Sequence, residues 1–157
     1  MLLPVLIAIH VLAVVIWIGG VAFVTIIIFP MIMRMEGSSE KMMLFQGIEH
    51  RFEKIAKISV AVVGLTGGWM LQLTGGWKTL FSAGGIGPTL MVSVWTFYVL
   101  VLLFEPRLFK AISRGETQQK TSRVFFRLTV FHWVVLVLSL LVIGVGVWSD
   151  HGGTLFR

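Results

Sequence analysis

Four long apolar segments constrain this chain more than any other feature of its sequence. They run from about Leu2 to Met33, Ile55 to Leu73, Pro88 to Phe104 and Leu128 to Trp148. Each is long enough to cross a hydrocarbon core of about 30 Å, for which a helix needs about 20 apolar residues (range about 17–25). Only 13% of the 157 residues are charged and 57% are hydrophobic, which leaves too little polar surface for a soluble domain. The sequence therefore predicts an all-α fold, a single transmembrane domain built as an integral membrane four-helix bundle.

The positive charges predict the orientation of these spans. The first and third connections carry Arg34, Lys41, Arg51, Lys54, Lys57, Arg107, Lys110, Arg114, Lys120, Arg123 and Arg127. The second connection has only Lys78, and the segment after the fourth span only Arg157. Cytoplasmic loops are enriched in Lys and Arg, so we expect the N- and C-termini on the outer, periplasmic side. Because the cations lie between apolar runs, they indicate topology and not a nucleic-acid partner.

The stretch at about 40–54, just before the second span, has an amphipathic pattern. Its charged residues alternate with Met42, Leu44, Phe45 and Phe52, among others. This pattern is typical of a helix that lies along the membrane surface. We expect such a helix to be continuous with the second span.

Few polar side chains lie inside the spans, and such groups are costly there, so they are candidates for function. The chain has no cysteine, which excludes disulfides and thiolate metal sites. No Asp, Glu or Lys interrupts the apolar cores of the spans, which argues against an ion-coupled transporter. His10 and His132 are the main candidates that remain.

The four histidines fall into two pairs by depth. If Pro30 marks the inner boundary of the first span, His10 lies about 30 Å away, near the outer face, where His151 also lies. His132 and His50 lie toward the inner side. Neutral imidazole is the usual axial ligand of b-type haem, so the pairs predict one or two haems held between helices. The alternative for each histidine is an interhelical hydrogen bond.

Helical spacing assigns the two intramembrane histidines to faces with other residues. His10 shares a face with Ala13 and Trp17, and His132 shares one with Val135 and Ser139.

Two further groups offer metal or anion ligands. Met31, Met33 and Met35 carry thioethers, which suit copper(I), but side chains two residues apart diverge on a helix, so apolar filling is favoured. Arg107 and Arg127 flank spans at the inner face and are candidates for contacts with haem propionates or with lipid phosphates.

Several stretches resemble a known membrane-protein superfamily. The run His10-Val-Leu-Ala-Val-Val-Ile-Trp17-Ile-Gly19-Gly20-Val-Ala-Phe23 resembles the first helix of the CopD-like copper-resistance family and of the HemJ-type protoporphyrinogen oxidases. The second span resembles theirs through Arg51-Phe-Glu-Lys-Ile-Ala, Gly64, Gly68, Trp69 and Met70, and the region from the third span to the fourth through Phe104-Glu-Pro-Arg107, Arg114-Gly115-Glu116 and Phe125-Phe-Arg127.

The resemblance implies two activities, both in the inner (cytoplasmic) membrane of a bacterium. The oxidase branch implies a haem-b oxidoreductase that takes electrons from a porphyrinogen, with His10 as the histidine of the first helix. The copper-resistance branch implies copper binding or transport through His10 and methionines. A quinone or other redox partner, a homo-oligomer and a subunit of a larger complex are the expected associations. Our leading hypothesis is a b-type haem protein that transfers electrons within or across the bilayer.

Overall fold

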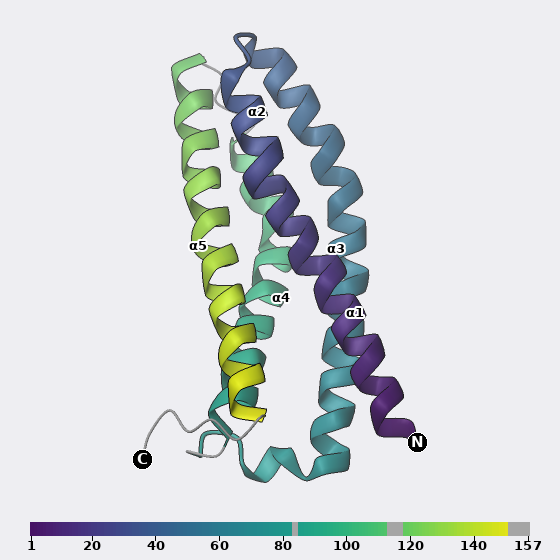
Figure 1. Cartoon of the computed structure of the whole chain (residues 1–157). Coiled ribbons are helices and arrows are strands. Elements are labelled where there is room, and N and C mark those ends of the chain that lie inside the picture. Colours follow the sequence, from purple (N-terminus) through teal and green to yellow (C-terminus); the bar gives the residue numbers. More distant parts are fainter. Residues whose placement is uncertain (83–84, 113–117, 151–157) are drawn as a thin grey trace.

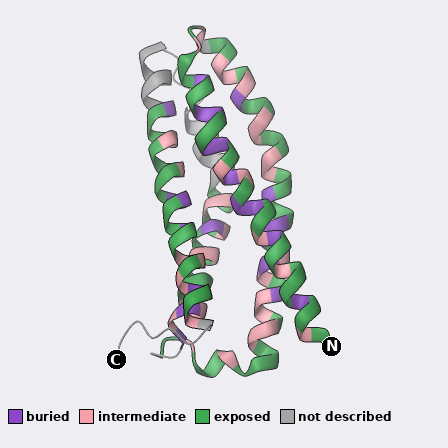
Figure 2. Ribbon diagram, in the orientation of Figure 1, coloured by how far each residue is buried: buried purple, intermediate pink, exposed green. Residues whose placement is uncertain are grey.

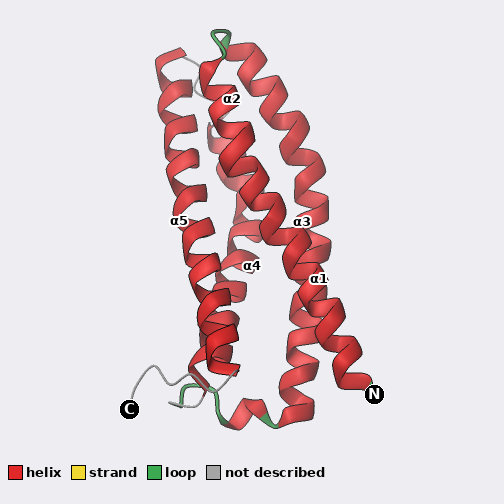
Figure 3. Cartoon of the chain, viewed as in Figure 1, coloured by secondary structure: helices red, strands yellow, loops and turns green. Residues whose placement is uncertain are grey.

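The chain forms a bundle of long helices. The computed structural model describes residues 1–82, 85–112 and 118–150, with the side chains of 38, 105–112, 118–124 and 150 not described. The helices are α1 (Leu2–Phe23), a π-helix η1 (Val24–Ile28), α2 (Phe29–Arg34), α3 (Ser38–Thr74), a 3₁₀ turn η2 (Gly76–Lys78), α4 (Ile86–Ile112) and α5 (Gln118–Asp150). All regular structure in the described residues is helical (Figure 3).

The helices pack as two antiparallel pairs. The continuous rod of α1, η1 and α2 packs along α3, and α4 packs along α5 (Figure 1). Met1, the turn between α3 and α4, and the end of α5 share one end of the bundle, which we name the terminal end. The turn between α2 and α3, near Gly37, lies at the opposite end, which we name the basic end.

The prediction of four helices suited to a membrane is confirmed. Four helical stretches are long and apolar enough to cross one: Leu2–Arg34, Ser39–Thr74, Ile86–Phe104 and Phe125–Ser149. Large apolar side chains point outward along them, including Ile58 (67% exposed) and Leu65 (74%), and Figure 2 shows exposed residues over much of the outer surface. Lipid covers such a surface without cost, whereas water does not.

Pro30 does not end the first helix, although the predicted depth of His10 took Pro30 as the inner boundary of the first span. The rod continues to Arg34, and Met35 is the first extended residue. A proline has no N–H and its ring collides with the carbonyl four residues earlier, so a regular α-helix is strained there. The wider π-helix directly before it, closed by a bond from the Phe29 N–H to the Val24 carbonyl, accommodates this strain.

The amphipathic stretch at 40–54 has a different environment from the one predicted. It is continuous with the second span, as expected, because α3 is a single helix of 37 residues, about 55 Å long. Part of its apolar side, however, packs against other helices of the bundle. The Phe45 ring lies 6.0 Å from that of Phe29 and 5.3 Å from that of Phe125. Protein side chains therefore cover Phe45, which the pattern alone would assign to lipid.

Two clusters of buried side chains form the core. The central cluster contains Ala13, Trp17, Ile18, Val21, Ala56, Val60, Val63, Tyr98, Val135 and Leu136. The basic-end cluster contains Val24, Ile28, Phe29, Ile32, Phe45 and Phe125. The first cluster joins all four long helices near mid-height, and the second closes the bundle at its basic end.

Candidate functional site

His10 lies on the interior face of α1. Its neighbours on that face, Ala13 and Trp17, are 7% and 4% exposed, as their predicted common face requires. His10 itself is only partly buried. Its Nδ1 lies 2.9 Å from Oγ1 of Thr66 on α3. A Cβ on Gly67 would lie 3.2 Å from Cε1 of His10, so the imidazole rests on the backbone of α3 where that helix has no side chain.

The hydrogen bonds of Thr66 determine which nitrogen of neutral His10 carries the proton. The Thr66 hydroxyl has one proton, and its Oγ1 lies 2.6 Å from the Val62 carbonyl, which can only accept. The hydroxyl therefore donates to Val62 and accepts from His10. Nδ1 of His10 is thus the N–H donor, and Nε2 keeps the lone pair that a metal ion would bind.

His132 has the same tautomer through a different partner. Its Nδ1 lies 2.9 Å from the carbonyl oxygen of Leu128, one turn earlier on α5. A carbonyl accepts, so Nδ1 donates and Nε2 again keeps the lone pair. The ring, however, is packed among aromatic side chains. Its centroid lies 4.8 Å from that of Phe29, which is fully buried, and 5.8 Å from that of Phe131.

The two interior histidines belong to separate levels of the bundle. His132 contacts Phe29, and Phe29 is nineteen residues from His10 on one continuous rod. At 1.5 Å per residue this separation is about 28 Å. One metal ion therefore cannot bind both, and each histidine has to be considered with its own surroundings.

An aromatic layer lies between these levels. The rings of Trp17 and Tyr98 meet edge to face with centroids 4.3 Å apart, and the Tyr98 hydroxyl lies 3.2 Å from Oγ of Ser139. Trp17 is seven residues from His10, and Ser139 is seven residues from His132, about 10 Å of helix rise in each case. The layer connects α1, α4 and α5 midway between the two histidines.

Trp95 was not singled out by the sequence analysis, yet it joins the two helix pairs. Its Nε1 donates to the Val60 carbonyl at 2.8 Å, and its indole covers Gly64 of α3, where an added Cβ would lie 2.7 Å from Cε2. A tryptophan in one span and a glycine in another were the available signals. Their pairing depends on how α3 and α4 are rotated, which the sequence does not show.

His50 and Arg127 are the other predicted site residues that the structure describes, and both are exposed. His50 is exposed, and it lies two residues from Phe52, whose ring packs over Gly20 of α1. Two residues turn a helix by about 200°, so His50 faces away from α1. The structure therefore does not bring His50 to His132. Arg127 is exposed, and both His151 and the side chain of Arg107 lie outside the described residues.

The described residues contain no cluster of three or more His, Asp or Glu side chains suited to a metal ion. Met31 and Met33 are 45% and 39% exposed. What the described part of the chain offers a cofactor is therefore a single interior imidazole at each of two levels.

Comparison of the chain with models of known protein families, with curated proteins and with solved structures gave no match. The resemblance to the CopD-like and HemJ-type proteins therefore stays a prediction.

Proposed function

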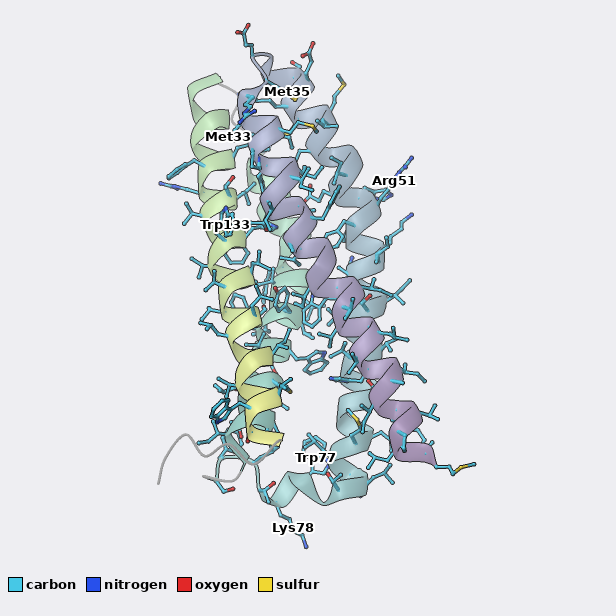
Figure 4. The ribbon with its side chains drawn as sticks, viewed as in Figure 1. Met33, Met35, Arg51, Trp77, Lys78 and Trp133 are labelled. Atoms are coloured by element: carbon cyan, nitrogen blue, oxygen red, sulfur yellow. The ribbon has the colours of Figure 1, made fainter. Side chains whose placement is uncertain are left out.

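We propose that the chain is a multi-pass protein of the bacterial inner membrane, with its basic end in the cytoplasm. The concentration of Lys and Arg in the first and third connections supports this orientation. Trp77, exposed near the terminal end (Figure 4), and Trp148, exposed near the end of α5, fit a membrane–water interface at that end, because indole rings prefer the headgroup region. His10 then lies in the outer half of the bilayer.

Within this arrangement we propose that the protein binds haem b through His10 and transfers electrons. The observation that carries the proposal is the hydrogen bond from Nδ1 of His10 to Thr66, which leaves the lone pair that iron would need on Nε2. Histidines that bind metals usually donate their other N–H to an oxygen, which fixes the ring and makes the ligating nitrogen more basic. His10 donates its Nδ1 proton to the Thr66 oxygen in this way.

The surroundings of His10 fit a flat cofactor better than those of His132. The imidazole of His10 rests on the α3 backbone at Gly67, so no α3 side chain packs on that side of the ring. At His132, by contrast, the fully buried Phe29 occupies the adjacent space. The proposal is therefore one haem at His10, with His132 in a packing role.

The chain's own residues would have separate tasks at such a site. His10 would hold the iron through Nε2, and Thr66 would fix the imidazole. Trp17 and Tyr98 form an aromatic contact about 10 Å of helix rise farther into the bundle, toward His132. Haem b, when bound, supplies one-electron redox chemistry. A porphyrinogen or a quinone as the redox partner is supported by the family resemblance alone.

The test is a spectrum of the purified protein, oxidised and reduced, after expression with ample haem supply. We expect a Soret band, iron near one atom per chain and no copper. His10→Ala should lose the band. His50→Ala is the matched control, because His50 is an exposed histidine on the outward face of α3, and it should keep the band. His132→Ala should also keep it.

Three outcomes would refute the haem proposal. The parent protein could show no Soret band, His10→Ala could keep its haem, or stoichiometric copper could be found without iron. The last result would favour the copper-binding alternative. Circular dichroism and size-exclusion chromatography of each variant verify that a lost band does not reflect an unfolded bundle.

A further inference from the structure

A single stripe on the outward face of α3 changes from basic to apolar along its length. The stripe follows helical spacing through Arg51, Lys54, Ile58, Ala61 and Leu65, all of them exposed. The opposite face of α3 packs against α1 through the central cluster. Figure 4 shows Arg51 pointing away from the bundle. One face of one helix thus presents cations beside a surface suited to acyl chains.

Arg51 and Lys54 differ from the neighbouring Lys57 in their charge partners. Lys57 forms an ion pair with Glu53, one turn earlier. Among the described residues no carboxylate forms an ion pair with Arg51 or Lys54. Residues three apart on a helix are neighbours, so the guanidinium and the ammonium can reach one anion together. A guanidinium binds two oxygens of a phosphate at once, and an ammonium adds a third donor.

The level of these cations in the bundle is unusual. Phe52 packs on Gly20, so Arg51 lies near the level of Gly20. The first rod stays apolar for another fourteen residues, to Arg34, about 21 Å farther toward the basic end. On that rod Phe23, Ile26 and Ile27 are each more than 50% exposed. The apolar belt therefore reaches much farther toward the basic end on α1 than on α3.

We propose that the α3 stripe is a binding site for an anionic phospholipid, with its phosphate at Arg51 and Lys54 and its acyl chains along Ile58 and Leu65. Cations placed this far into an apolar belt need a counter-charge, and a lipid phosphate drawn to them supplies it. The proposal rests on the membrane insertion proposed above and is independent of the haem. An acidic soluble protein is a less suitable partner, because it would leave the apolar half of the stripe uncovered.

The test is native mass spectrometry of the full chain released from mixed vesicles of phosphatidylglycerol and phosphatidylcholine. The parent should retain phosphatidylglycerol preferentially. Arg51→Gln with Lys54→Gln should lower this preference by roughly fivefold per cation, about 25-fold in all. Arg51→Lys with Lys54→Arg keeps both charges and should retain most of it. Lys78→Gln removes an exposed cation at the terminal end (Figure 4) and should leave the preference unchanged.

Each alternative result has a definite meaning. Equal retention of phosphatidylglycerol by the parent and the double glutamine variant would overturn the lipid site, as would an equal loss in Lys78→Gln. Displacement of the lipid by millimolar inorganic phosphate would also overturn it, because a free anion would then suffice. Release of the chain from membranes by alkaline carbonate would refute the membrane insertion itself. A missing Soret band would affect only the haem proposal.

Discussion

The contact between Gly64 and Trp95 gives a stability prediction that requires no assumption about a cofactor. In Gly64→Ala, the new Cβ would lie 2.7 Å from Cε2 of Trp95 if nothing moved. Ordinary contacts between carbon atoms are about 3.5–4.0 Å, so the indole has to retreat by about 1 Å. Its Nε1 now lies 2.8 Å from the Val60 carbonyl, and the same shift would lengthen that hydrogen bond beyond its useful range.

The expected cost follows from three contributions. Overpacking of a well-filled interior costs about 1–3 kcal/mol, and the lost hydrogen bond costs about 1 kcal/mol. Replacing glycine by alanine inside a helix returns about 1 kcal/mol. Gly64→Ala should therefore lower the free energy of unfolding by about 1–3 kcal/mol.

Gly68, one turn farther along α3, provides the matched control. An added Cβ there meets no atom within 4 Å. Gly68→Ala should therefore leave stability unchanged or raise it by up to about 1 kcal/mol. The measurement is unfolding of the purified protein in mixed detergent micelles with increasing SDS, followed by circular dichroism. If Gly64→Ala proves as stable as Gly68→Ala, the proposed fit of Trp95 against α3 is incorrect.

Three further predictions address the site and the packing around it. Thr66→Val should weaken haem binding about 10- to 100-fold in a titration of the apoprotein, whereas Thr66→Ser should bind haem as the parent does. Equal haem affinities of the parent and Thr66→Val would show that Thr66 does not support the site. Tyr98→Phe deletes the hydroxyl bonded to Ser139 and should cost about 0.6 kcal/mol in SDS unfolding. Adding Ser139→Ala should then cost little more, whereas full additivity would mean that the two hydroxyls do not interact. Gly87→Val would place a Cβ 3.3 Å from the Gly146 Cα, and only movement of the backbone would relieve this contact. The free energy of unfolding should therefore fall by about 1–3 kcal/mol. An unchanged free energy of unfolding would contradict the close approach of α4 to α5.

Much of the candidate site was predictable from helical spacing. His10 shares an interior face with Ala13 and Trp17, and Ala13 and Trp17 are buried as that face requires. The same holds for His132 with Val135 and Ser139. Periodicity predicts such faces because the angle between residues on one helix is a local property. The pairing of His50 with His132 could not be predicted from the period of one helix, because it required two helices to have a particular relative rotation.

The sequence by itself determined that this protein has four apolar helices and which residues share each inward face, because span length and helical period follow from local composition. Only the tertiary structure decided which groups meet: Thr66 with His10, Phe29 with His132, and Trp95 with Gly64. It also decided that the stretch at 40–54 packs inside the bundle through Phe45. These contacts depend on the tilt, rotation and axial register of whole helices. Such quantities are fixed by packing across the entire bundle, and no local pattern encodes them.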